Sequence, residues 1–91
     1  MAYKQRFKPA CDKHDVCYAC GKVLNVKKSR CDLIFKANME RYCSTITNNS
    51  EQDKCNGNAT AYYVGVSLFE WKSYLKNSKS WCEQSWVSQC I

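Results

Sequence analysis

The residues best suited to chemistry lie in one short stretch, CDKHDVCY at positions 11–18. It holds the one histidine of the chain, His14, directly before Asp15. The ordinary pKa of histidine lies near neutrality, so His14 could serve as a general base. On a helix, His14, Cys17 and Tyr18 would share one face, with Asp15 about 100° around the axis. A base and a carboxylate that could bind a metal ion would then stand on one rigid element held by cysteines, which is the support a catalytic site needs.

Zinc binding is a second interpretation of this stretch, because potential ligands recur at every third position: Cys11, His14, Cys17 and Cys20. Each three-residue step on a helix falls about 60° short of a full turn, so four such residues sweep about 180°. They cannot converge on one tetrahedral ion without breaking the helix. The spacing therefore argues against zinc.

Two helices are expected to position these residues. The first begins near Pro9, a residue favoured in a first helical turn, and continues to Gly21, a plausible stop. The second begins at Ser29 and ends near Cys43. Ser29 and Asp32 have the spacing of a capping box, in which a hydroxyl and a carboxylate cap the helix start.

The rest of the chain is expected to hold a loop, a third helix and a short tail. The polar stretch 44–57 indicates a loop tethered by Cys55. A third helix runs from near Asn58 to about Lys76, and the tail 80–91 forms a short helix pinned by two cysteines. The residues that recur at helical spacing, and would form the core stripe of the third helix, are Val64, Leu68, Trp71 and Leu75, widened by Tyr62, Val66 and Phe69. The predicted fold class is all-α, with any sheet limited to a small hairpin.

Length and cysteine content predict a single disulfide-stapled domain over residues 1–91. A chain of 91 residues has a small core, and its eight cysteines are typical of a secreted scaffold. Eight cysteines allow 105 pairings, which the sequence does not distinguish. Two glycosylation sequons, at Asn48 and Asn58, fit an exported chain. We expect Met1 to be an expression start on a mature domain, since no apolar leader follows it.

The net charge of +6 favours an anionic partner. Lipid headgroups fit better than nucleic acid, because a disulfide-rich chain is expected outside the cell. A basic surface that only keeps the chain soluble is the plainer interpretation of the same charge. The aromatic residues have a similar pair of interpretations, as core or as the lining of an acyl-chain groove or membrane rim: Tyr62, Phe69, Trp71, Tyr74, Trp81 and Trp86.

The stretch 11–18 resembles the active-site helix of secreted phospholipases A2, whose pattern is Cys-x-x-His-Asp-x-Cys-Tyr. That family places a further Asp directly after a cysteine on a second, antiparallel helix, and Cys31 followed by Asp32 fits this position. The matching segments run from about Pro9 to Cys43, roughly half of the chain. Within the family, the residues before the His-Asp pair look like the short, divergent branches of invertebrate venoms, fungi and bacteria.

The resemblance implies roles for these residues. His14 would be the general base that takes a proton from water, and Asp32 would accept a hydrogen bond from the other ring nitrogen. Tyr18 would hold Asp32 through its hydroxyl, and Asp15 would bind Ca²⁺. The ion would polarise the ester carbonyl, and the reaction would be hydrolysis of the sn-2 ester of a phospholipid at a membrane surface. The resemblance also implies a disulfide between Cys17 and Cys31.

One departure concerns calcium. The family takes most of its calcium ligands from a glycine-rich loop upstream of the His-Asp helix, but thirteen residues precede His14 here and none is glycine. Ca²⁺ takes six to eight oxygens, so Asp15 cannot hold it alone. A second chain or a missing N-terminal segment could supply the remaining ligands, which are not identifiable in this chain. Otherwise the domain would be an inactive binding protein or toxin on the same scaffold.

A third hypothesis is an unrelated disulfide-rich matrix protein in which the His-Asp pair is coincidental. It predicts that His14 points away from Asp32. Each residue also has an ordinary structural interpretation: His14 as a partly exposed or structural histidine, Asp15 as a solvated surface carboxylate, and Tyr18 as a core aromatic with a solvated hydroxyl.

Overall fold

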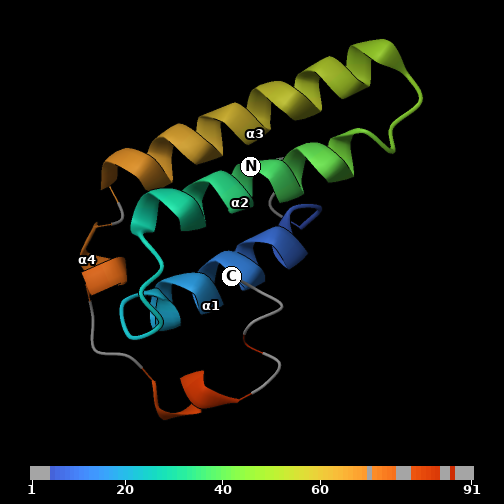
Figure 1. Ribbon diagram of the computed structural model, residues 1–91. Helices are drawn as coiled ribbons and strands as arrows, with labels where there is room; N and C mark the ends of the chain where they lie inside the picture. Colours follow the sequence, from blue (N-terminus) through green and yellow to red (C-terminus); the bar gives the residue numbers. More distant parts are fainter. Residues whose placement is uncertain (1–4, 70, 76–78, 85–86, 88–91) are drawn as a thin grey trace.

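The computed structural model describes residues 5–69, 71–75, 79–84 and 87. Its elements are the helices α1 (Lys8–Gly21), α2 (Lys28–Cys43), α3 (Asn49–Phe69) and α4 (Trp71–Leu75), followed by the short 3₁₀ helix η1 (Ser80–Glu83). Figure 1 shows the three long helices side by side, with α2 in contact with both α1 and α3. The described residues contain no strand, so the predicted all-α class is confirmed. Within them, no helix is both long and apolar enough to span a bilayer.

Helix α1 matches its predicted bounds to within one residue. Pro9 lies in its first turn, and Gly21 is its last residue. A Cβ atom at Gly21 would lie 2.9 Å from the carbonyl oxygen of Val26 and 3.2 Å from the ring of Tyr74. The missing side chain therefore lets the following loop and helix α4 pack against the end of α1.

Helix α2 begins at Lys28, one residue earlier than expected, and the predicted capping box is wrong. Lys27 is the N-cap residue, and no side chain caps this helix end. Ser29 lies inside the helix, while the carboxylate of Asp32 forms hydrogen bonds with His14, Tyr18 and Lys28. Because its carboxylate accepts hydrogen bonds from these buried donors, Asp32 does not cap the N-terminus of α2.

The predicted loop over 44–57 is wrong for most of its length, because α3 already begins at Asn49. The side-chain oxygen of Asn48 accepts a hydrogen bond from the backbone N–H of Glu51 at 3.0 Å, as an N-cap residue does. The polar residues that suggested a loop thus start a helix. Cys55 lies on that helix and is bonded to Cys43, which closes the connection between α2 and α3.

The predicted core stripe of the third helix is wrong for most of its members. The buried positions of α3 are the small residues Cys55 and Ala59, one turn apart, where the helix can approach α2 closely. Tyr62 and Val66 are partly buried and pack against the core. The other predicted stripe residues are largely exposed, with Phe69 at 80%: Val64, Leu68, Phe69, Trp71 and Leu75.

Among the described residues, three disulfides and one main core hold the helices together. The disulfides are Cys17–Cys31, implied by the resemblance, Cys20–Cys82, and Cys43–Cys55. Cys11 forms no disulfide with any residue the structure describes, and Cys90 lies outside the described residues. The core between the long helices consists of Phe7, Ala10, Phe35, Met39, Cys43, Cys55 and Ala59.

The predicted short helix of the tail is present in part, as η1, which Cys82 fastens to α1. Among the tail aromatics, Trp81 is partly buried next to this disulfide. Trp86 lies outside the described residues. Within the described part of the tail, this disulfide anchors η1 to the helix that carries His14.

Candidate active site

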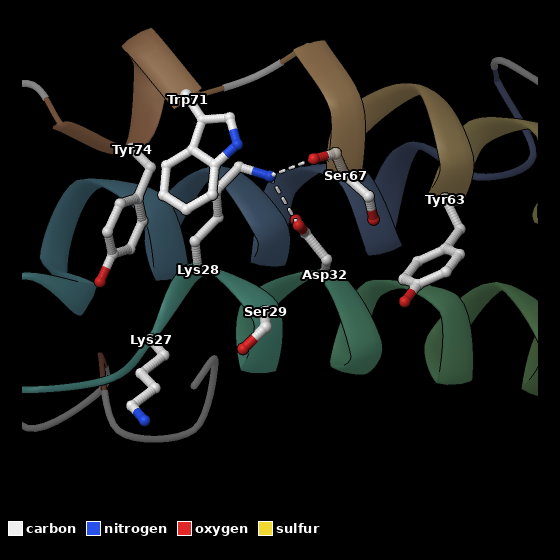
Figure 2. A pocket seen from close by; sticks show the side chains of 8 residues that line it. All are labelled: Lys27, Lys28, Ser29, Asp32, Tyr63, Ser67, Trp71 and Tyr74. Carbon is white, nitrogen blue, oxygen red and sulfur yellow. Dashed lines mark hydrogen bonds and ion pairs between the residues drawn. The ribbon is translucent and has the colours of Figure 1, made fainter.

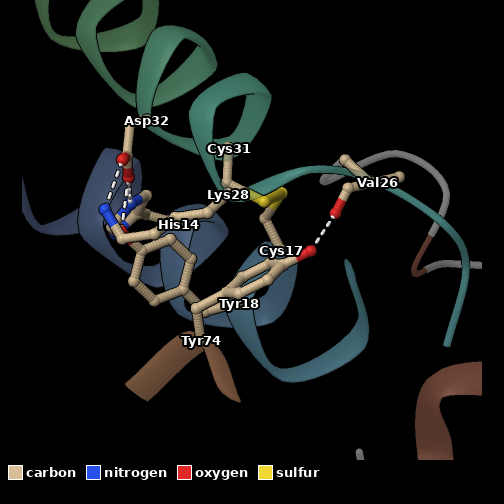
Figure 3. The surroundings of a disulfide bond; sticks show 8 residues. All are labelled: His14, Cys17, Tyr18, Val26, Lys28, Cys31, Asp32 and Tyr74. Atoms are coloured by element: carbon tan, nitrogen blue, oxygen red, sulfur yellow. Dashed lines mark hydrogen bonds and ion pairs between the residues drawn. A yellow bond between two sulfur atoms is a disulfide. The ribbon is translucent and has the colours of Figure 1, made fainter. Parts of the chain in front are cut away.

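His14 and Asp32 meet in the interior, between α1 and α2 (Figure 3). The Nε2 atom of His14 lies 2.8 Å from Oδ1 of Asp32. His14 is only 7% exposed and Asp32 only 2%, so this contact is shielded from water. The Cys17–Cys31 disulfide joins the same two helices one position before Tyr18 and Asp32, and holds them at this distance. The coincidence hypothesis, which requires His14 to point away from Asp32, is wrong.

Asp32 is surrounded by hydrogen-bond donors. The hydroxyl of Tyr18 donates to Oδ1 at 2.5 Å, and Nζ of Lys28 donates to Oδ2 at 2.8 Å. Burial alone would raise the pKa of the Asp32 carboxyl, but the hydrogen bonds from Lys28, Tyr18 and His14 outweigh it and lower this pKa. Asp32 is therefore ionised at neutral pH.

The ring of His14 is fixed in plane as well as in direction. It stacks on the ring of Phe35, with centroids 4.4 Å apart and planes inclined by 25°. Because the ionised Asp32 only accepts hydrogen bonds, Nε2 is assigned as the protonated nitrogen and Nδ1 of the neutral ring as a proton acceptor. The expectation of a partly exposed histidine is wrong: the ring forms part of the wall of a small cavity of about 180 Å³.

Asp15 is exposed and lines the same cavity as His14. No group of three or more His, Cys, Asp or Glu side chains that could hold a metal ion occurs among the described residues. The nearby Asp12 forms an ion pair with Lys8 at 3.0 Å. Since Ca²⁺ takes six to eight oxygens, Asp15 does not by itself fit a calcium ion.

Most of the chain matches a known protein family. A sequence profile of the family described as prokaryotic phospholipase A2 matches residues 1–70. The chain belongs to this family. The matched region contains α1, α2 and α3, and therefore both partners of the buried His14–Asp32 contact.

Curated relatives match a shorter region. Conodipine-P3 of Conus purpurascens is 40% identical over 47 residues, which is 52% of this chain and 26% of the relative. Conodipine-M alpha chain of Conus magus is 42% identical over 41 residues, 45% of this chain and 53% of the relative. The chain thus spans about a quarter of the length of the first of these relatives. No solved structure matches the chain.

Two residues of the site, Lys28 and Phe35, were not predicted from the sequence. Lys28 precedes Asp32 by four residues, a spacing at which opposite charges meet on a helix. This signal was present, but it is common on exposed helix faces. Phe35 carries no chemical signal, since only the packing of α1 on α2 places it against His14.

Proposed function

We propose that the chain is the active-site part of a phospholipase A2 that hydrolyses the sn-2 ester of phospholipids, with His14 as general base. The observation that carries this proposal is the buried contact between His14 Nε2 and Asp32 Oδ1 on two helices that match the family. A solvated surface histidine has no need of a buried, ionised carboxylate. A histidine that must gain and return a proton in a fixed orientation does.

In the proposed reaction, Nδ1 of His14 takes a proton from a water molecule as that water attacks the ester carbonyl. The imidazolium that forms is stabilised by the negative charge of Asp32, which Tyr18 and Lys28 hold in its ionised form. Nδ1 then returns the proton to the leaving alcohol oxygen. The products are a free fatty acid and a lysophospholipid, and His14 is neutral again.

Calcium is the proposed cofactor, and Asp15, next to His14, is its proposed ligand in this chain. One carboxylate does not make a calcium site. The remaining ligands would come from a second chain or from residues outside the described part. We therefore assign no catalytic step to the ion.

A lipid surface outside the cell is the proposed place of action. The net charge of +6 favours anionic headgroups. Large apolar side chains at the end of α3 and in α4 lie open to solvent, where they could enter the headgroup region: Leu68, Phe69, Trp71 and Leu75. The three disulfides among the described residues fit an oxidising compartment.

The test is phospholipid hydrolysis by the oxidised protein, using vesicles labelled in either the sn-1 or the sn-2 fatty acid. Release of the sn-2 label in excess Ca²⁺, and its loss on adding a chelator, would support both the reaction and the cofactor. Release that survives the chelator would support the reaction and reject calcium. Release of the sn-1 label alone would reject the positional assignment.

An inactive binding protein or toxin on the same scaffold is the second candidate. Among the described residues that line the cavity beside His14, Asp15 is the single acidic side chain. One carboxylate does not complete a calcium site, which favours this candidate. In that case neither label would be released in either condition, while the protein would still bind the vesicles in a sedimentation assay.

A further inference from the structure

The most unusual charged group of the described residues is the ammonium of Lys28, which is only 3% exposed. It donates to Oδ2 of Asp32 at 2.8 Å and to the backbone carbonyls of Val66 at 2.7 Å and Ser67 at 3.2 Å. Figure 2 shows it between Asp32, Ser67 and the ring of Trp71, whose centroid lies 4.9 Å away. These three hydrogen bonds match the three N–H donors of an ammonium group.

These contacts join three helices at one atom. Lys28 is the first residue of α2, the carbonyls belong to the last turns of α3, and Trp71 begins α4. A cation is stabilised near the carbonyl end of a helix, so the end of α3 is a favourable partner for it. Burying a charge is costly all the same, and apolar residues of similar size often hold helices together equally well. A buried ammonium here therefore calls for a role that an apolar residue could not fill.

The two oxygens of Asp32 divide their partners in a way that indicates such a role. Oδ2 is taken by Lys28, whereas Oδ1 is shared by His14 and Tyr18. The terminal torsion of an aspartate has broad minima, so a carboxylate held on one side alone can rotate. With Lys28 fixed to the end of α3, the oxygen that faces His14 stays in place.

We propose that Lys28 is a positioning residue for the His14–Asp32 pair, fastening the carboxylate of Asp32 to the end of α3 so that Oδ1 holds the histidine ring. The expected effect of Lys28 on catalysis rests on the proposed function, whereas its effect on the orientation of Asp32 and His14 does not. Lys28 touches no reacting atom and acts only through Asp32.

The test compares Lys28→Met, Lys28→Arg and the matched control Lys27→Met. Lys27 is exposed and, together with Lys28, lines a cavity of about 420 Å³. Its replacement therefore removes an equal charge from the neighbouring position. Residues that orient metal ligands from the outer shell typically affect activity by about 10–100-fold, and Lys28 would orient Asp32 in a comparable way. We expect Lys28→Met to lower kcat by about that factor with KM changed less than about threefold, Lys28→Arg to recover part of kcat, and Lys27→Met to leave kcat unchanged.

A double-mutant cycle separates positioning from a general loss of packing. In an Asp32→Asn background, Lys28→Met should have almost no further effect on kcat, because the carboxylate that Lys28 fastens is no longer present. An equal loss in both backgrounds, or a wild-type kcat in Lys28→Met, would overturn the proposal. If Lys28→Met does not fold, Lys28→Gln removes the charge with a smaller change in polarity and enters the same cycle.

Proton NMR of the histidine ring distinguishes the failure of this inference from the failure of the proposed function. The hydrogen bond from His14 to Asp32 should give a low-field ring proton in the wild type that is lost or weakened in Lys28→Met and kept in Lys27→Met. This readout needs no turnover. If the wild type released no fatty acid, the proposed function would fail, while an unchanged low-field signal in Lys28→Met would separately reject the role of Lys28.

Discussion

Replacing the three glycines by alanine, one at a time, separates helix propensity from close packing. Gly21, Gly57 and Gly65 all lie in helices, and none has a positive φ angle. Alanine in place of glycine stabilises a helix interior by about 0.5–1 kcal/mol. A Cβ at Gly57 or Gly65 would meet nothing within 4 Å. Both variants should therefore gain about that much free energy of unfolding.

Gly21 should behave in the opposite way. Its new Cβ would lie 2.9 Å from the carbonyl oxygen of Val26, which is backbone and cannot simply rotate aside. That oxygen also accepts a hydrogen bond from the hydroxyl of Tyr74 at 2.6 Å, and the N–H of Val26 donates to the carbonyl of Gly21 at 2.7 Å. Overpacking of this kind costs about 1–3 kcal/mol, and the helix gain at a terminal position is small. We expect a net loss of about 1–2 kcal/mol.

Thermal unfolding followed by far-UV circular dichroism, with the disulfides intact, measures all three variants. A loss of 1 kcal/mol lowers Tm by about 4–8 °C in a domain of this size. Gly21→Ala should therefore melt clearly below the wild type, with the other two at or above it. A wild-type Tm for Gly21→Ala would refute the argument that Val26 packs too closely against Gly21 to admit a Cβ atom. A Tm below the wild type for Gly57→Ala or Gly65→Ala would refute the argument that alanine stabilises these helix positions.

Three further predictions concern stability. Met39→Ala should lower the free energy of unfolding, measured in urea, by about 2–5 kcal/mol because Met39 is fully buried. Leu33→Ala, at an exposed position, should lower it by less than about 0.5 kcal/mol. Equal losses in the two variants would contradict the assigned core. Replacing both Cys20 and Cys82 by alanine should lower the free energy of unfolding by about 4 kcal/mol, since this disulfide has a sequence separation of 62. A loss below about 1 kcal/mol would count against the pairing. Because its pKa is lowered in the folded protein, Asp32 adds stability that is complete above its ordinary value near 4 and is lost as the pH falls through the folded value. The gap in unfolding free energy between wild type and Asp32→Asn should therefore narrow below about pH 4, and a gap independent of pH would argue against an ionised Asp32.

The part of the site carried by strong local signals could be predicted from the sequence. Pro9 and Gly21 mark the ends of α1, and the resemblance to secreted phospholipases A2 implied both the contact with Asp32 and the Cys17–Cys31 disulfide. The ends of α1 follow from local residue types, whereas the contact and the disulfide follow from the family whose motif the sequence carries. They need no knowledge of how α3 packs.

Features that depend on tertiary contacts were not predictable in the same way. Asn48 looks like a loop residue until its side chain is seen to cap α3. The buried face of that helix follows Cys55 and Ala59 rather than its larger apolar residues, because small side chains permit close approach. Lys28 is buried only because the end of α3 offers carbonyl groups to its ammonium. In each case a contact between distant segments decides the role of a polar or small residue.

The most direct test of the central claim is fatty acid release from sn-2-labelled vesicles by wild type, His14→Gln and the control Lys13→Gln. Lys13 is the exposed neighbour of His14 on the same helix. General acid–base catalysis typically contributes about 10²–10⁴-fold, so His14→Gln should lose that factor while remaining folded by circular dichroism. Lys13→Gln should retain the wild-type rate. Release by His14→Gln within tenfold of the wild type would contradict the assignment of His14 as the base.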